Sequence, residues 1–236
     1  MIDKVCPSVA EAIADIHDGA TVMIGGFGEA GSPIELIHAL IDHGAGGLTV
    51  VNNNPGSGEV GLAALIAAGR VVKLICSYPR SANSTVFPER YRAGEIELEL
   101  VPQGTLAERI RAGGAGIPGF YTPTAVGTPL AEGKEHRTFD GRTHVLERGL
   151  TADFALIRGH RADLYGNVVY NMTARNFGPH MATAAHTTIV QVREVVPAGD
   201  IDPETVVTPG IFVDRVVEVP KPLHESELVA AGACYP

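Results

Sequence analysis

The sequence predicts an α/β protein with an open, mainly parallel β-sheet, helices on both faces of that sheet, and a β-rich C-terminal portion. Short apolar segments alternate with amphipathic helical segments through the first 113 residues, and this alternation is typical of parallel sheets that are covered on both sides. Several strand-like segments are apolar throughout, which indicates burial on both faces. Since no fixed-period repeat and no linker divides the sequence, residues 1–236 are expected to form one domain.

The first predicted helix and strand lie within residues 8–24. Ser8 and Glu11 have the spacing of a capping box, apolar residues follow at helical intervals, and Gly19 is a C-terminal stop, so residues 8–19 are expected to be helical. The segment "ATVMI" at 20–24 is apolar and β-rich, which predicts a buried strand.

The alternation continues from residue 32 to residue 113. A second helix is expected at 32–44, with Ser32 as N-cap, Pro33 at the first helical position and Glu35 closing a second capping box. Apolar, β-rich runs predict the next strands, and amphipathic runs predict the helices between them. The strands are expected at 48–52, 71–76 and 96–101, and the helices at 60–69, around 88–94 and at 105–113.

The C-terminal half is expected to contain mostly strands. Residues 113–128 are too rich in Gly and Pro for helix or strand, and the aromatic pair Phe120 and Tyr121 favours an ordered, packed loop there. The pattern around Asp140-Gly141 predicts a hairpin at 136–147. Further strands are expected at 153–158, 167–171, 186–192 and 211–219, with one helix at 178–185.

The composition favours a folded protein and excludes several partners. Hydrophobic residues make up 45% of the chain and charged residues 19%, so a sizeable core is expected. A net charge of −9 argues against a nucleic-acid surface. No apolar run has membrane-spanning length, and the acidic N-terminal segment lacks the features of a signal peptide, so we expect a cytoplasmic protein. The three separated cysteines and the absence of H-E-x-x-H predict neither a disulfide framework nor a metal site.

The stretch "VMIGGFGEAGSP" at 22–33 is the most informative motif. Its Gly26-x-Gly28-x-x-Gly31 pattern matches the dinucleotide fingerprint between a strand and a helix. A nicotinamide site also needs an acidic residue at the end of the next strand, but asparagines occupy 52–54 here, so a dehydrogenase is disfavoured. Bare backbone beside a helix N-terminus still suits an anionic ligand. A tight turn without a ligand is the alternative.

Three loops are expected to meet at one edge of the sheet. The glycine loop, the segment "NNNPGSGE" at 52–59 and the segment "VPQGT" at 101–105 each follow a predicted strand. Ligands of open α/β sheets bind outside the carboxyl ends of the strands. A binding site is therefore expected where these loops converge.

The chain resembles the alpha subunits of the family I coenzyme A transferases. Residues 18–33, "DGATVMIGGFGEAGSP", match the alpha-chain signature of that family position for position, and residues 101–124 and 173–179 resemble two further blocks. The likeness extends from about residue 3 to residue 219. It implies the fold of these transferases, and coenzyme A (CoA) as a co-substrate with no tightly bound cofactor.

The resemblance also implies a partner chain. In the family, a glutamate in a Ser-Glu-Asn-Gly segment of the beta half attacks an acyl-CoA thioester and carries CoA to a second acid. This sequence has no Ser-Glu-Asn-Gly segment. A separate beta subunit is therefore expected to supply the nucleophile. Glu29 in the glycine loop is a candidate nucleophile within this chain, but it occupies a variable position of the signature, and an ordinary solvated side chain is the alternative.

Several residues of this chain receive roles from the resemblance. Gln103 corresponds to the glutamine whose amide donates to the thioester oxygen; the alternative is a helix-capping role. Asn53 either contacts the substrate carboxylate or supports a turn, and Arg175 either pairs with an anion or forms a structural ion pair. Phe27 either lines the pantetheine passage or belongs to the core. The stretch implied in CoA binding is Gly25, Gly26, Phe27, Gly28, Glu29, Ala30 and Gly31.

The resemblance also suggests which acid is used. Residues 76–104 follow the alpha subunits of the 3-oxoadipate branch of the family more closely than the acetoacetate branch, which implies succinyl-CoA as donor and 3-oxoadipate as acceptor. Ala125-Val126 and the segment "YNMT" before Ala174 depart from the usual pattern, so acetoacetate or another 3-oxo acid is the alternative. A non-enzymatic sugar-phosphate sensing module of similar fold is a further alternative.

Overall fold

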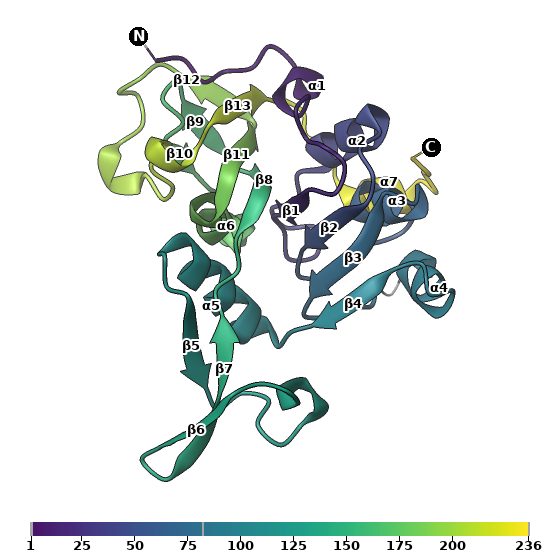
Figure 1. Ribbon diagram of the computed structural model, residues 1–236. Coiled ribbons are helices and arrows are strands. Elements are labelled where there is room, and N and C mark those ends of the chain that lie inside the picture. Colours follow the sequence, from purple (N-terminus) through teal and green to yellow (C-terminus); the bar gives the residue numbers. More distant parts are fainter. Residues whose placement is uncertain (1, 82, 236) are drawn as a thin grey trace.

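A seven-stranded parallel sheet forms the centre of the molecule. The computed structural model describes residues 2–81 and 83–235 (Figure 1). The strand order is β13-β11-β8-β1-β2-β3-β4, and every neighbouring pair is parallel. The predicted open parallel sheet is therefore confirmed. Its strands are β1 (Thr21–Ile24), β2 (Leu48–Val51), β3 (Val71–Cys76), β4 (Glu97–Leu100), β8 (Ala152–Arg158), β11 (Ala185–Val192) and β13 (Arg215–Glu218).

Helices cover both faces of this sheet, as predicted. Alternate side chains of a strand point to opposite faces, so Val22 and Ile24 of β1 pack into one apolar cluster and Met23 into the other. The first cluster includes residues of α1 (Val9–Ala12), α2 (Ile34–His43), α3 (Gly61–Ala67) and α4 (Val86–Arg92). The second includes residues of α5 (Gln103–Gly114) and α6 (Gly178–Ala184).

The strand order reverses beside β1. The chain runs from β1 outwards through β2, β3 and β4, and later returns to place β8, β11 and β13 on the other side of β1. Such a reversal leaves a crevice at the carboxyl ends of the two central strands, here β1 and β8. The loops after β1 and β8 therefore border a natural ligand site.

A small sheet and a C-terminal helix were not predicted. The small sheet has the order β10-β9-β12, formed by β9 (Arg161–Asp163), β10 (Val168–Val169) and β12 (Glu194–Val196). Short 3-10 turns lie at Met172–Arg175, Pro203–Thr205 and Gly210–Phe212. After β13, the chain crosses to α7 (Glu225–Ala230), and the ring of Tyr235 stacks on that of His38 with centroids 3.7 Å apart. Among the described residues, no helix has the length and apolarity that a membrane span requires.

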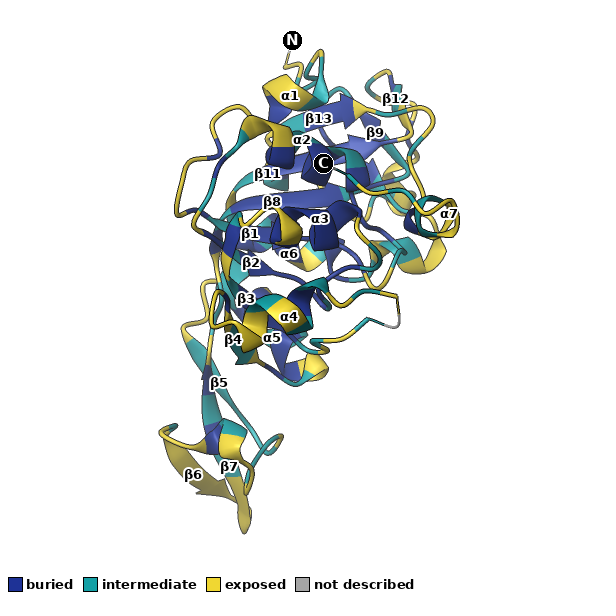
Figure 2. Cartoon of the chain, turned by 90° about the vertical axis from the view of Figure 1, so that its right-hand side faces the viewer, coloured by how far each residue is buried: buried dark blue, intermediate teal, exposed yellow. Residues whose placement is uncertain are grey.

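An antiparallel arm projects from the body of the molecule (Figures 1 and 2). It consists of β5 (Gly119–Thr122), β6 (His136–Phe139) and β7 (Arg142–Arg148), in the order β5-β7-β6, with a 3-10 turn at Pro129–Ala131. The predicted hairpin turn is confirmed, because Asp140 and Gly141 have φ angles of 48° and 74°. The prediction of irregular structure throughout 113–128 is wrong. Here α5 continues to Gly114, and pairing with β7 makes a strand of residues 119–122.

Helix 32–44 forms, but its predicted capping box is wrong. Pro33 is the N-cap and makes no side-chain capping bond. The Glu35 carboxylate accepts hydrogen bonds from Gln191 Nε2 at 2.6 Å and from the backbone N–H of Leu223. Tertiary partners have replaced the local one, because β11 and the C-terminal segment bring donors to this helix start.

Three predicted elements are also shorter in the structure than the sequence predicted. The first helix keeps its Ser8 cap, with Glu11 N–H donating to Ser8 Oγ at 3.2 Å, but ends after Ala12. The strand predicted at 211–219 begins only at Arg215, because Gly210–Phe212 form a 3-10 turn. The strand predicted at 167–171 is reduced to β10. Element ends depend on tertiary contacts that apolar periodicity does not report.

Candidate active site

A cavity of about 620 Å³ lies outside the carboxyl ends of β1 to β4. We call it the amide cavity because the side chains of Asn53 and Gln103 lie in its wall. The three loops predicted to converge, which follow β1, β2 and β4, all contribute to it, and the loop after β3, which was not predicted, contributes as well. Its lining consists of Phe27, Gly28, Asn53, Asn54, Ser57, Ser77, Tyr78, Arg80, Ser81 and Gln103.

A hydrogen-bond network centred on Asn53 holds this wall together. Gln103 Nε2 donates to Asn53 Oδ1 at 2.9 Å, and Ser77 Oγ donates to the same oxygen at 2.7 Å. The backbone carbonyl of Asn53 accepts from the N–H groups of Ser77 and Tyr78 at 3.2 and 3.1 Å. Asn53 is 4% exposed, so these bonds are largely shielded from water. The loops after β2, β3 and β4 are thereby locked to one another.

Gln103 occupies a position suited to stabilising negative charge. It is the first residue of α5, and the preceding Pro102 is the N-cap. The first N–H groups of a helix have no intrahelical acceptor, so the helix start attracts anions. The capping alternative required the Gln103 side chain to bond the helix backbone. It bonds the Asn53 side chain instead. A primary amide has two N–H bonds, and the bond to Asn53 orients the amide while using one of them.

The glycine loop forms a tight turn at the edge of the amide cavity. Phe27 N–H donates to the carbonyl of Ala30 at 3.0 Å, and Gly26, Gly28 and Gly31 have φ angles of 129°, 57° and 78°. A Cβ on Gly31 would lie 2.2 Å from the carbonyl oxygen of Ala174, so this position requires glycine. Phe27 is 52% exposed and lines the cavity, which rules out the core alternative.

Asn176 holds the glycine loop in place and was not singled out from the sequence. Its Oδ1 accepts from the N–H of Gly26 at 3.3 Å, and its Nδ2 donates to the carbonyl of Ala30 at 2.8 Å. The only sequence signal was its position within the resemblance block 173–179. Nothing local indicated that this block would contact a loop 150 residues earlier.

A second, larger cavity lies on the other side of the glycine loop, at the β1/β8 reversal. It has a volume of about 830 Å³. We call it the cationic cavity because Arg158, Arg193 and Lys221 line it, together with Glu29 and Glu227. Burial of Arg158 lowers the pKa of its guanidinium, while nearby Glu35 and Glu29 counteract that effect. Three permanent cations against two carboxylates favour an anionic occupant.

Glu29 lies apart from Gln103. Its carboxylate faces the cationic cavity and contacts His224 Nδ1 at 3.1 Å, and it does not line the amide cavity. The two residues therefore do not share one reaction volume. Gly31 and Ala30 also face the cationic cavity, whereas Phe27 and Gly28 face the amide cavity. The stretch from Gly25 to Gly31 thus separates the two cavities.

Two other sequence features lie outside the amide cavity. Arg175 is exposed, and no ion pair joins it to another residue within 2–81 and 83–235. Ala125 and Val126 lie in the arm after β5, where Ala125 adopts a φ of 71°. Neither residue lines the amide cavity or the cationic cavity.

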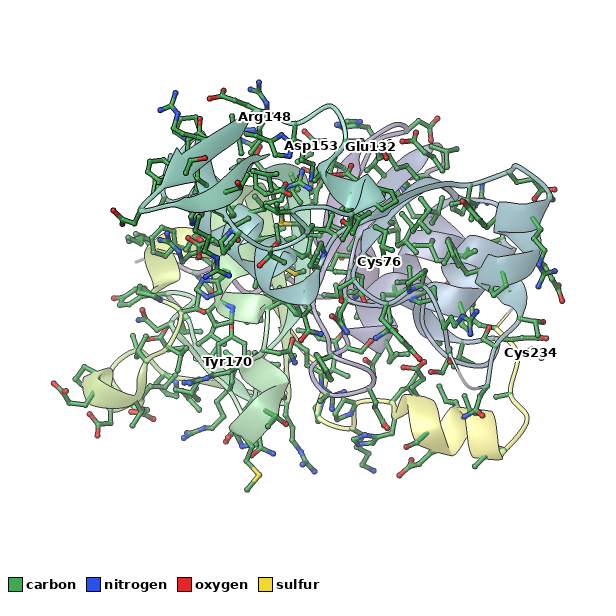
Figure 3. The ribbon with its side chains drawn as sticks, turned by 90° about the horizontal axis from the view of Figure 1, so that it is seen from below. Cys76, Glu132, Arg148, Asp153, Tyr170 and Cys234 are labelled. Atoms are coloured by element: carbon green, nitrogen blue, oxygen red, sulfur yellow. The ribbon has the colours of Figure 1, made fainter. Side chains whose placement is uncertain are left out.

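No cysteine of the described chain is placed to act as a nucleophile in the amide cavity. Cys76 precedes Ser77, but it is fully buried, and desolvation raises the pKa of its thiol to about 12. Cys234 donates to a carboxylate oxygen of Glu59, and the bond raises the pKa of this thiol. Figure 3 shows Cys76 in the interior and Cys234 at the periphery beside the C-terminal segment. Thiols at these positions remain protonated near neutral pH.

Known proteins resemble the chain over nearly its whole length. A family model described as coenzyme A transferase matches residues 7–219. The chain is 59% identical over 219 residues to the A subunit of 3-oxoadipate CoA-transferase from Pseudomonas putida, covering 93% of this chain and 95% of the relative. It is 53% identical over 214 residues to the A subunit of a probable succinyl-CoA:3-ketoacid coenzyme A transferase from Bacillus subtilis (strain 168), covering 91% and 89%.

A solved structure shares the fold. The acyl-CoA transferase YdiF from Escherichia coli O157:H7, crystallised as apoenzyme, is similar with a TM-score of 0.81 at 24% identity. The match covers 94% of this chain and 48% of that chain, so the chain spans about half the length of the solved protein.

Proposed function

The chain belongs to the coenzyme A transferase family, and from that premise we propose that it is the alpha subunit of an enzyme that transfers CoA from succinyl-CoA to 3-oxoadipate. The observation that carries this proposal is the 59% identity to the Pseudomonas putida relative, which is named for 3-oxoadipate. A family match across residues 7–219 also disfavours the sugar-phosphate sensing alternative.

The reaction we propose uses a glutamate of a separate beta subunit. Its carboxylate attacks the thioester carbonyl of succinyl-CoA, forming a succinyl-glutamyl anhydride and releasing CoA thiolate. The thiolate attacks the glutamyl carbonyl, which releases succinate and leaves a glutamyl-CoA thioester. The carboxylate of 3-oxoadipate then attacks this thioester, and the same two steps in reverse order release 3-oxoadipyl-CoA. CoA is a co-substrate, and we propose no tightly bound cofactor.

This chain contributes charge stabilisation and positioning. Attack on a thioester places negative charge on its carbonyl oxygen, and an amide donor fixed beforehand stabilises that charge more in the transition state than in the ground state. We assign this role to Gln103. The bond from its Nε2 to Asn53 supports the assignment, because it fixes the orientation of the amide. Asn53 acts in this scheme through Gln103, as a positioning residue.

We also propose that the glycine loop, from Gly25 to Gly31, binds CoA alongside the amide cavity. Two observations support this. The loop backbone is bare of side chains at four of its seven positions, and Phe27 is half-exposed at the cavity wall, where a pantetheine chain can pack against its ring. The cationic cavity beyond the loop offers charge of the sign that the phosphates of CoA require.

The alternative acceptor is another 3-oxo acid such as acetoacetate. The observation that favours it is the 53% identity to the Bacillus subtilis relative, which is named for 3-ketoacids. The two candidates differ in one respect that matters for the site, because 3-oxoadipate carries a second carboxylate and acetoacetate does not.

Reconstitution tests the proposal. The purified chain, the beta subunit purified separately, and their mixture are each assayed for transfer of CoA from succinyl-CoA to 3-oxoadipate and, in a parallel reaction, to acetoacetate. We expect product only from the mixture. Robust transfer by this chain alone would contradict the division of the active site between two chains. Transfer to acetoacetate but not to 3-oxoadipate would establish the alternative acceptor.

A further inference from the structure

The wall of the amide cavity is neutral except at one position. Within the described chain, the residues that line it are glycine, aromatic, serine and amide residues together with Arg80, and no carboxylate is among them. An anion that enters the cavity therefore meets one permanent positive charge and no permanent negative charge. This contrasts with the chain as a whole, whose net charge is −9.

Residues on both sides of Arg80 are hydrogen-bonded to the cavity wall, by backbone groups on one side and by a side chain on the other. On the N-terminal side, the N–H groups of Ser77 and Tyr78 donate to the carbonyl of Asn53 at 3.2 and 3.1 Å. On the C-terminal side, Ser81 Oγ donates to Ser57 Oγ at 3.0 Å. Asn53 is also the residue that orients Gln103. The base of the Arg80 side chain is consequently fixed relative to the proposed oxyanion donor.

Within residues 2–81 and 83–235, the guanidinium of Arg80 has no counter-ion. No carboxylate of the described residues forms an ion pair with it, whereas Arg90, Arg109 and Arg215 are each paired with one. Arg80 is exposed, so its charge is free to meet a carboxylate that comes from outside the chain.

We propose that Arg80 binds the second, non-reacting carboxylate of a dicarboxylic acid and thereby selects dicarboxylic over monocarboxylic acids. The inference rests on the proposed function and specifies its substrate class. A guanidinium forms two parallel hydrogen bonds with a carboxylate, which fixes both position and direction. With one end of the acid held at Arg80, the other end is directed to Gln103 in the same cavity.

Both substrates of the proposed reaction carry this group. The succinyl group of the donor and the 3-oxoadipate acceptor each end in a free carboxylate, so one cation serves both half-reactions. A monocarboxylic acid of equal length would place a methyl group beside the guanidinium. That acid makes no hydrogen bond with Arg80 at this end, and the guanidinium stays solvated by water. Selectivity thus arises from a contact that only dicarboxylic acids make.

The test uses the reconstituted two-chain enzyme and a matched pair of acceptors. 3-Oxoadipate and 3-oxohexanoate have the same six-carbon chain, with a carboxylate or a methyl group at the far end. Because CoA resides on the enzyme between the two half-reactions, kcat/KM for an acceptor is independent of the donor. For Arg80→Gln we expect kcat/KM for 3-oxoadipate to fall about 10- to 100-fold, the effect of one charge-assisted hydrogen-bonded contact. For 3-oxohexanoate we expect a change of about twofold or less.

Two further variants make the outcome decisive. Arg80→Lys keeps the positive charge but loses the paired N–H donors of the guanidinium. Its preference for 3-oxoadipate should therefore lie between those of Arg80→Gln and the wild type. Arg92→Gln removes an exposed arginine at the end of α4 and should leave both acceptors unchanged. Equal losses for both acids with Arg80→Gln would overturn the inference, as would no loss for either. Impaired co-elution of the Arg80→Gln chain with the beta subunit, with unchanged acid preference, would instead assign Arg80 to the interface between the two chains.

The proposed function and this inference fail separately. If the wild-type pair of chains transfers CoA to neither acid, the function itself is wrong. If the pair transfers CoA and Arg80→Gln leaves the preference between the two acids unchanged, the function stands and the role of Arg80 is refuted.

Discussion

At the scale of single residues, the Asn53 carboxamide organises the candidate site. One oxygen accepts hydrogen bonds from Gln103 and Ser77, which lie 50 and 24 residues further along the chain. Because this oxygen is nearly inaccessible to water, losing either donor leaves a poorly satisfied polar group. The arrangement explains how a side chain as flexible as glutamine can be held ready for catalysis at an exposed helix start.

The role of Gln103 leads to a first prediction at this scale. In the reconstituted enzyme, Gln103→Ala should lower kcat on the order of 100-fold, because one preorganised donor to the thioester oxygen is lost. Steady-state kinetics with succinyl-CoA and 3-oxoadipate measures the effect. Glu108→Ala is the matched control, since Glu108 lies on the same helix and pairs with Arg111 at its surface. Turnover of Gln103→Ala near the wild-type value would show that this amide is not the donor.

At the scale of elements, the short helix α7 begins at a buried carboxyl group, that of Glu225. Glu225 is 6% exposed, and the backbone N–H of Ser57 donates to its carboxylate. Burial raises the pKa of Glu225 above its ordinary value of 4.5, and the nearby carboxylate of Glu29 raises it further, although the bond from Ser57 acts in the opposite direction. The folded protein therefore retains this proton to a higher pH than the unfolded chain does.

Glu225 gives a prediction about the pH dependence of stability. Between the unfolded-state pKa near 4.5 and the raised folded-state pKa, stability falls as pH rises, because the folded state binds more protons there. Glu225→Gln removes this loss. We expect its melting temperature to exceed that of wild type by about 1–4 °C at pH 8 and by less at pH 5. Calorimetry on the isolated chain measures both values.

The exposed Glu227 on the same helix provides the control for this prediction. Glu227→Gln should show no difference from wild type that depends on pH. If Glu225→Gln lowered the melting temperature at pH 8, the charged form of Glu225 would be stabilising α7, and the inferred direction would be wrong.

At the scale of the whole molecule, the arm is structurally separate from the sheet that holds the site. Figure 2 shows that most of its surface is exposed, with a small buried part near its centre. The arm supports itself through local contacts. Tyr121 packs edge-on against Phe139 with centroids 5.3 Å apart, and Lys134 pairs with the buried Glu147 at 2.5 Å. Its base is held by Arg109, whose Nε donates to the carbonyl of Arg148 at 3.0 Å.

The separateness of the arm can be tested by excision. Residues 123–144 are replaced by Asn-Gly, because Thr122 and Val145 are paired neighbours and a two-residue turn can join them. Glu147→Gln is added, since excision removes its partner Lys134. We expect the melting temperature to stay within about 5 °C of wild type, because the main sheet and its helices lose no packing partner. Loss of cooperative unfolding would mean that the arm supports the body.

Much of the fold follows from the sequence alone. The strand predicted at 71–76 has the bounds of β3, and the apolar alternation correctly indicated a parallel sheet covered on both sides. These features depend on local properties, namely the spacing of apolar residues and the positions of Gly and Pro, which each segment carries by itself. The convergence of three loops at one sheet edge follows from the same pattern, because parallel strands end on the same side.

Tertiary structure decided which side chains meet at that edge. Sequence reasoning placed the loops of Asn53 and Gln103 at the same edge of the sheet, but their contact depends on the register between β2, β3 and β4. The sequence also did not indicate that the Glu29 side chain would face the cationic cavity, on the opposite side of the glycine loop from Gln103. Nor did it indicate that Asn176 would hydrogen-bond that loop. Apolar periodicity determines which face of a segment is buried. Which polar groups come within hydrogen-bonding distance is decided by strand register and loop path, and these are fixed only when the whole chain packs.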